Sequence, residues 1–439
     1  MKKNILYLLF VVPALAFVAC QDNDNNVFDE KSSLRMQKTL ETAKEVLCSS
    51  DNGWVLSYYP NRELSYGGIA YTIKFSETEA EVGCAYMPDS TYTSYYKLTN
   101  DNGPVLSFDT YNPIMHYFAT PSSEEYEAKD GDFEFVIESI DTDVIRLYGK
   151  RTLNTMYLHR LDADAASYRK AAFDNRDYFF AGFKGIIGSG NVVGKFDLDG
   201  GHLYVGHGDV DNMTDTIATM PFMMTDKGIE LYKPILVGGV SFQEMTADRD
   251  NNTFALTADD GEQIVVDAVK LPDTYVRYSE IAGDYTLTYN QNTLDVTLSD
   301  SLMASSFSMG GINPNYRFNL GYDRNSGNLT WTYQYLGYYT SNDGESYPIY
   351  LFSWDAANGY LGQSEREGFN LVRDVSSQKL SFNFQLMETA TRNYNSFYML
   401  YLYLDDAGEY NVDVPPASWG WSFNGGESRF PYLQSLTKK

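Results

Sequence analysis

The sequence has little positive charge for its length. Its 439 residues carry 33 Lys and Arg against 59 Asp and Glu, a formal net charge of −26. Proteins that bind nucleic acid neutralise backbone phosphates with basic side chains, so we expect no nucleic-acid partner. Hydrophobic residues make up 43% of the chain and aromatic residues 15%, which excludes a chain that is disordered throughout. At about 100–200 residues per domain, the length predicts two to four domains.

Histidine and catalytic motifs are also scarce. Among the four His, only His202 and His207 are close in sequence, and an offset of five places them on opposite faces of a strand. That geometry is poor for sharing a zinc ion. The sequence has no His-Glu-x-x-His, no Gly-x-Ser-x-Gly and no Walker-type glycine loop. We therefore assign no catalytic residue and consider an enzyme less favoured than a binding protein.

The first 19 residues have the layout of a bacterial signal peptide. Two Lys precede an apolar run, Ile5 to Val18, that is too short to span a membrane comfortably. Ala19 before Cys20 resembles a lipobox, in which cleavage leaves Cys20 as the lipid-bearing N-terminus. Residues 20–30 are polar and acidic, which predicts a flexible tether and resembles the export signal of surface lipoproteins in Bacteroidetes. We expect a lipid anchor in the outer membrane and exposure at the cell surface.

Cysteine is rare as well. Cleavage before Cys20 leaves only Cys48 and Cys84 in the rest of the chain. Two thiols in an oxidising compartment exclude a scaffold built on disulfides. They allow one disulfide between Cys48 and Cys84, and two reduced buried thiols are the equal alternative.

Short alternating runs of apolar and polar residues, broken by Gly, Asn and Asp, fill most of the chain. Asp199-Gly200-Gly201 and Asn325-Ser326-Gly327 are typical of hairpin turns. Helical spacing predicts short helices over residues 31–48 and 164–180, the second capped by Asp164. We expect a mainly β protein of several antiparallel sheet modules, sandwich-like or barrel-like, with short helices leading the first two.

Weak internal similarity divides the chain further. The pentapeptides that begin at Gly228 and Gly327 each lead, after ten residues, to another Gly. A small, acidic stretch at 162–165 and a break at Pro272 separate the similar regions. The predicted modules are residues 31–161, 164–272 and 278–439, the last with an aromatic C-terminal tail.

Several segments near the N-terminus follow a known pattern. They are Asn52-Gly53-Trp54, Tyr66-Gly67-Gly68 before a strand from Tyr71 to Phe75, and the run from Gly103 to Asp109. With Cys20 and the first helix, they resemble an uncharacterised family of Bacteroidetes lipoproteins, the domain of unknown function 4302. The resemblance implies an accessory protein that works beside a TonB-dependent transporter and its surface lipoprotein in nutrient import. It carries over no catalytic residue.

One turn has the composition of a cation site. Asp209, Asp211 and Asp215 place oxygen ligands at alternate positions, where Ca²⁺ could bind. The glycine and the terminal Glu of an EF-hand loop are missing, and an ordinary solvated turn is the alternative. We expect no other cofactor.

The C-terminal region is rich in aromatic residues. Tyr401 and Tyr403 share one face of the predicted strand from Phe397 to Leu404, and Trp419 and Trp421 follow in a loop-rich tail. Aromatic rings on a rigid β surface can stack on sugar faces. These four residues are the candidate ligand-binding residues, and packing of both Trp against the third module is the alternative.

Together these features predict a surface-exposed outer-membrane lipoprotein that binds glycan or peptide as an accessory to a nutrient-import system. One alternative is a secreted hydrolase whose carboxylates meet only in the folded chain. Another is a structural or docking subunit of the import complex.

Overall fold

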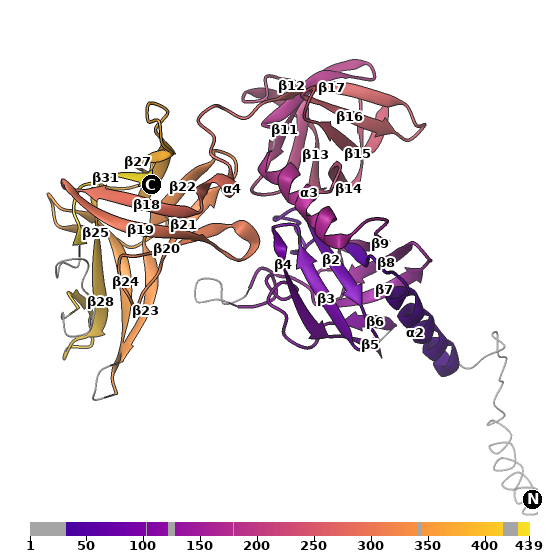
Figure 1. Ribbon diagram of the computed structural model, residues 1–439, viewed down its shortest axis with the longest axis horizontal. Coiled ribbons are helices and arrows are strands. Elements are labelled where there is room, and N and C mark those ends of the chain that lie inside the picture. Colours follow the sequence, from indigo (N-terminus) through magenta and orange to yellow (C-terminus); the bar gives the residue numbers. More distant parts are fainter. Residues whose placement is uncertain (1–31, 102, 122–127, 179, 341–343, 416–428) are drawn as a thin grey trace, which may run out of the picture.

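A computed structural model of the protein describes residues 32–101, 103–121, 128–178, 180–340, 344–415 and 429–439. The predicted signal peptide, Cys20 and tether lie outside the described residues. Within the described ranges, no helix is long and apolar enough to cross a membrane. The chain is mainly β, with several antiparallel sheets and few helices, as the alternating pattern predicts (Figure 1).

Nine antiparallel strands form an open sheet, which we call the N-terminal sheet. Its strands are β1 (Trp54–Tyr58), β2 (Ile69–Phe75), β3 (Glu79–Cys84), β4 (Met87–Tyr95), β5 (Lys97–Asn100), β6 (Pro104–Ser107), β7 (Glu134–Ile140), β8 (Val144–Gly149) and β9 (Thr155–Arg160). Their order is β4-β3-β2-β1-β9-β8-β7-β6-β5. The predicted first helix is confirmed as α2 (Ser32–Cys48), which packs against this sheet. Trp54 fixes its end by donating an indole hydrogen bond to the Leu47 carbonyl at 2.9 Å.

Eight strands close into a barrel, the central barrel, which has a hydrophobic core of its own. Its strands are β10 (Gly182–Ile187), β11 (Gly190–Asp197), β12 (His202–Gly208), β13 (Met213–Met224), β14 (Gly228–Val237), β15 (Val240–Asp248), β16 (Thr253–Ala258) and β17 (Gln263–Val269). The predicted second helix is confirmed as α3 (Ala165–Asp177). Its cap is also confirmed, because the Asp164 carboxylate accepts a hydrogen bond from the Ser167 amide at 2.9 Å. Helix α3 contacts both the N-terminal sheet and this barrel (Figure 1).

A second closed barrel, the C-terminal barrel, follows the short helix α4 (Tyr278–Ile281). Its strands are β18 (Gly283–Tyr289), β19 (Asn292–Asp300), β20 (Ser306–Gly310), β21 (Phe318–Asp323), β22 (Asn328–Thr332), β26 (Gly368–Arg373), β27 (Ser381–Leu386) and β31 (Leu433–Lys438). The 3₁₀ turn η1 (Leu302–Ala304) lies between β19 and β20. Strand β31, close to the C-terminus, pairs with both β18 and β27 and so closes the barrel.

A six-stranded sheet, the projecting sheet, is inserted into the C-terminal barrel and extends away from it (Figure 1). Its strands are β23 (Gln334–Thr340), β24 (Ser346–Asp355), β25 (Tyr360–Gly362), β28 (Ser396–Leu404), β29 (Tyr410–Asp413) and β30 (Arg429–Phe430). One face continues the barrel core, because Phe397 packs on Trp331 with ring centroids 4.6 Å apart. Ile349 and Met399 are fully buried on the same face.

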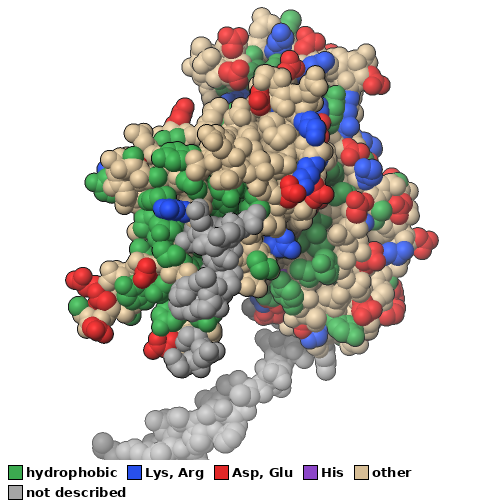
Figure 2. Space-filling view, turned by 60° about the vertical axis from the view of Figure 1, so that its left-hand side comes forward, with side chains coloured by type: hydrophobic (Ala, Val, Ile, Leu, Met, Phe, Trp, Pro, Cys, Tyr) green, Lys and Arg blue, Asp and Glu red, His purple; other side chains and the backbone are tan. Residues whose placement is uncertain are grey.

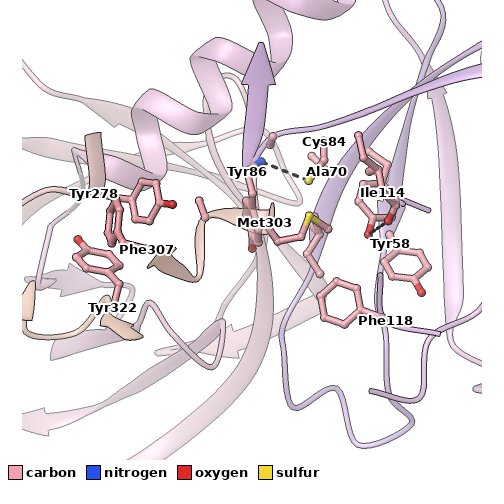
Figure 3. Packing of buried hydrophobic residues seen from close by; sticks show 14 of the residues in the cluster. Tyr58, Ala70, Cys84, Tyr86, Ile114, Phe118, Tyr278, Met303, Phe307 and Tyr322 are labelled. Atoms are coloured by element: carbon pink, nitrogen blue, oxygen red, sulfur yellow. Dashed lines mark hydrogen bonds between the residues drawn. The ribbon is translucent and has the colours of Figure 1, made fainter. Parts of the chain in front are cut away.

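The N-terminal sheet and the C-terminal barrel share one hydrophobic cluster. Met303 of η1 belongs to it, and Figure 3 shows its side chain reaching toward Ala70 and Phe118 of the N-terminal sheet. Met303 and Ala304 both have left-handed backbones, with φ of 62° and 51°. Such backbones cost about 1–3 kcal/mol for a residue other than Gly, and burial of a Met side chain recovers about 1.5–3 kcal/mol. Burial of the Met303 side chain is therefore comparable in free energy to the backbone strain at one of these two residues.

The N-terminal sheet and the central barrel meet at two glycines. Gly67 and Gly201 have φ of 63° and 65°, and a Cβ on Gly67 would lie 2.6 Å from the Gly201 Cα. Next to this contact, the Gly68 amide donates to the Phe222 carbonyl and the Phe222 amide donates to the Gly201 carbonyl, each at 2.9 Å. The two backbones thus approach more closely than any side chain would permit.

The substitution Gly201→Ala tests this close approach. A left-handed Ala alone costs about 1–2 kcal/mol, and the clash with Gly67 adds about 1–3 kcal/mol by overpacking. Gly261→Ala is the matched control, because Gly261 has a φ of 86° and nothing within 4 Å of an added Cβ. Urea denaturation will show a larger loss of unfolding free energy for Gly201→Ala. Equal losses in both variants would contradict the close approach.

Candidate functional site

The projecting sheet has an aromatic face that points away from the barrel core. Side chains alternate along β24, so Tyr350 and Trp354 lie on the face opposite the buried Ile349. Tyr333 stacks on Tyr350 with ring centroids 5.5 Å apart and an interplanar angle of 8°. We call this face the outer face, and its rings belong to Tyr333, Tyr335, Tyr338, Tyr350, Phe352, Trp354 and Tyr398. Figure 2 shows hydrophobic side chains gathered on the part of the surface that includes the projecting sheet.

A cavity of about 530 Å³ lies at the end of the projecting sheet, where β28 runs beyond the barrel core. We call it the tip cavity, and it is lined by Glu345, Ser346, Tyr347, Pro348, Tyr401, Leu402, Tyr403, Leu404 and Tyr410. The Tyr401 ring lies 5.5 Å from the rings of both Tyr347 and Tyr403. Tyr410 is 72% exposed, so at least one ring face is open to solvent. Volumes of roughly 300–1,000 Å³ are typical of small-molecule sites.

The tip cavity carries acidic and neutral polar groups. Among the described residues, its lining holds no Lys or Arg, and the Glu345 carboxylate accepts a hydrogen bond from the Tyr347 hydroxyl. Burial, followed by the nearby Asp413 carboxylate, raises the pKa of Tyr401 above its ordinary value. Phenols that stay protonated donate and accept hydrogen bonds at their edges while their faces remain apolar. This combination suits a neutral ligand with hydroxyl groups and an apolar face.

The candidate ligand-binding residues divide into two groups. Tyr401 and Tyr403 do lie together, at the tip cavity, and both are half-buried. Trp419 and Trp421 lie outside the described residues. The sequence of β28 alone does not predict that Tyr347 and Tyr410 belong to the same site. Their positions beside Tyr401 and Tyr403 depend on the pairing of β28 with β24 and with β29.

The family model described as domain of unknown function DUF4302 matches residues 24–249. The chain belongs to the DUF4302 family. A second model, DUF4987, also a domain of unknown function, matches residues 257–400. No curated protein matches the chain.

The two matched ranges of the DUF4302 protein meet inside the central barrel. The first ends one residue after β15, and the second begins within β16. These strands pair side by side, with Met245 opposite Leu256. Both matched ranges therefore contribute strands to one closed barrel.

In the predicted calcium turn, the three Asp side chains are not grouped as ligands of one metal ion. Asp209, Asp211 and Asp215 lie around the hairpin between β12 and β13, where the Asp215 carboxylate lies 2.9 Å from Nδ1 of His207. Across the described ranges, no group of three His, Cys, Asp or Glu side chains is placed to hold a metal ion. Cross-strand pairing turns Asp215 toward His207 instead.

The disulfide alternative is wrong, because Cys48 and Cys84 are free thiols. The Cys84 sulfur accepts a hydrogen bond from the Tyr86 amide at 3.3 Å, and burial raises the pKa of Cys84 to about 12. Cys48 donates to the Ser76 carbonyl at 3.1 Å. Each sulfur thus has a local hydrogen-bond partner within the N-terminal sheet.

One pair of carboxylates in the DUF4302 protein has a perturbed environment. Glu230 of β14 lies directly opposite Glu244 of β15. Burial, followed by repulsion from Glu244, raises the pKa of Glu230 to about 7. Paired carboxylates of this kind occur in hydrolases. Neither of them lines the tip cavity, so the pair lies apart from the candidate ligand site.

The raised pKa of Glu230 predicts how stability depends on pH. Folding favours the protonated acid, so this contribution is complete below the ordinary pKa of 4.5 and is lost as the pH rises through about 7. In Glu230→Gln, the fall in unfolding free energy between about pH 5 and about pH 8 will be smaller by roughly 1–3 kcal/mol. Urea denaturation at both pH values measures it. Glu262→Gln, in an exposed turn, is the control, and an unchanged slope in Glu230→Gln would refute the assignment.

Proposed function

We propose that the DUF4302 protein is an accessory glycan-binding protein of a nutrient-import system, held on the outer surface of the outer membrane by a lipid on Cys20. The observation that carries the binding role is the tip cavity, where Tyr347, Tyr401, Tyr403 and Tyr410 surround a space of about 530 Å³. A TonB-dependent transporter and its surface lipoprotein are the proposed partners. The lipobox and the acidic tether support the location.

The chemistry of the tip cavity favours a neutral glycan. Sugars present apolar C–H faces to aromatic rings and hydroxyl groups to polar edges. Tyr401 and Tyr403 supply rings and phenolic hydroxyls, and Glu345 supplies a carboxylate that accepts hydrogen bonds from sugar hydroxyls. Because the described lining has no basic side chain, it offers an acidic glycan no counter-charge. The net charge of −26 disfavours it further.

Binding of a peptide is less well supported. Peptides that add to a sheet pair with the backbone of an edge strand, and β29 is the edge of the projecting sheet beside the tip cavity. Its four residues offer a short template. The lining of the cavity also includes residues of β24 and β28 and Glu345 just before β24, which suits a compact ligand better than an extended one.

Affinity electrophoresis in gels that contain a neutral polysaccharide tests the proposal. Probes are starch, xyloglucan, α-mannan and, as an acidic comparison, polygalacturonate. We expect at least one neutral polysaccharide to retard the wild type, and Tyr401→Ala/Tyr403→Ala to weaken that retention roughly tenfold, since two stacked rings contribute about 1–3 kcal/mol. Tyr95→Ala is the control, because Tyr95 is exposed on β4 of the N-terminal sheet.

Two results would contradict the proposal. Equal retention of the double variant and the wild type would remove the tip cavity as the site. Retention by no neutral polysaccharide would remove the glycan function, and recovery of a transporter pair from membranes would then favour a docking subunit.

A further inference from the structure

A second cavity, of about 310 Å³, lies where the N-terminal sheet, the central barrel and the C-terminal barrel meet. We call it the junction cavity. Its wall includes Tyr66 and Tyr86 from loops of the N-terminal sheet and Arg176 from α3. Asp199 comes from the turn between β11 and β12, and Arg324 from the turn between β21 and β22. All three parts of the fold contribute to it.

The two arginines of this wall are buried, and neither forms an ion pair with a carboxylate of the described residues. Arg176 is 9% exposed and Arg324 is 5% exposed. Arg176 donates to the Tyr86 hydroxyl and the Leu198 carbonyl, and Arg324 donates to the Ala304 carbonyl. All three acceptors are neutral. Among the described residues, neither guanidinium lies within ion-pairing distance of a carboxylate.

The hydrogen bonding of Arg176 is also incomplete. Its Nε is buried and has no hydrogen-bond partner in the described part of the chain. Both guanidiniums lie over the ring of Tyr86, at 3.7 Å from its centroid for Arg176 and 5.7 Å for Arg324. Two positive charges therefore share one aromatic ring.

Such an arrangement is unfavourable without an anion. A buried charge loses its hydration, and removal from water is costly unless a counter-charge replaces it. Burial lowers the pKa of Arg176 to about 10, so this side chain still carries its charge near neutral pH. Lys129 also lines the cavity, where it donates a hydrogen bond to the Tyr117 hydroxyl. The Asp199 carboxylate interacts electrostatically with both guanidiniums but forms an ion pair with neither. An anionic ligand would supply a second negative charge for the two arginines.

We propose that the junction cavity binds a small organic carboxylate, with the carboxylate on Arg176 and Arg324. Guanidiniums bind carboxylates through parallel N–H donors. The aromatic wall, which includes Phe118, suits an organic ligand. Asp199 favours a monoanion that carries a hydroxyl or ammonium donor over phosphate, whose extra charge it would repel. A uronic acid and an amino acid both have this chemistry.

The proposal is independent of the glycan site. The junction cavity and the tip cavity share no lining residue. Variants of one therefore report nothing about the other. Because the junction cavity takes residues from three parts of the fold, its ligand will also hold those parts together and raise the unfolding temperature.

Isothermal titration and thermal unfolding of the full chain, at constant ionic strength, test the proposal. The probes are galacturonate, glutamate, glucose and inorganic phosphate. We expect galacturonate or glutamate to bind and to raise the unfolding temperature, while glucose and phosphate do neither. Galacturonate alone indicates an acidic sugar, and glutamate alone indicates an amino acid or a peptide terminus.

The variants connect binding to the arginines. Arg324→Gln will weaken binding of the carboxylate roughly tenfold or more, as expected for loss of a charged hydrogen bond in a buried site. Arg169→Gln is the matched control, since Arg169 is also 5% exposed and donates to Thr72 and Pro88 outside this cavity. We expect its affinity to equal that of the wild type.

A third variant keeps the test decisive if Arg324→Gln does not fold. Ser305 lines the cavity and is exposed, so Ser305→Phe will block the space without burying a new polar group. We expect Ser305→Phe to abolish binding. Absence of binding by either carboxylate, equal binding of phosphate or glucose, or unchanged affinity in a folded Ser305→Phe variant would overturn the proposal.

Discussion

The arrangement of the N-terminal sheet and the central barrel depends on a contact between two backbones, at Gly67 and Gly201. A side chain at either position would overlap the opposite backbone, so the approach is open to glycine alone. The neighbouring hydrogen bonds of Gly68 and Phe222 then extend the contact into a short backbone pairing. Because Asp199 and Tyr66 are one or two residues away, the same contact places two walls of the junction cavity.

A hydrophobic contact connects the C-terminal barrel to the N-terminal sheet. No backbone pairing is needed, because Met303 inserts an apolar side chain into the cluster of the N-terminal sheet (Figure 3). Met303 lies in η1 and has a left-handed backbone. The Arg324 guanidinium bonds the carbonyl of the next residue, Ala304, and so supports this turn. One of the buried charges therefore stabilises the docking element as well as lining the cavity.

A feature could be predicted from the sequence when the residues that determine it lie close together in the chain. The helices α2 and α3 and the mainly β class depend on neighbours within a few residues, so local patterns suffice. Closure of the barrels does not, because β10 pairs with β17 and β18 pairs with β31, far apart in the chain. Strand alternation likewise places Tyr401 and Tyr403 on one face. Only the cross-strand register brings Tyr347 beside them.

The net charge of the sequence likewise does not predict the local charge of a buried cavity. Net charge describes the field far from the protein, and that field falls off over about 8 Å at physiological ionic strength. Arg176 and Arg324 are buried, where their interactions are screened much less than those of the exposed acids around them. A chain with a charge of −26 can therefore hold two buried guanidiniums in the junction cavity and an aromatic, acidic tip cavity in the projecting sheet. Composition excludes a broad basic surface, but it has no bearing on two guanidiniums that the fold brings together from α3 and a distant hairpin.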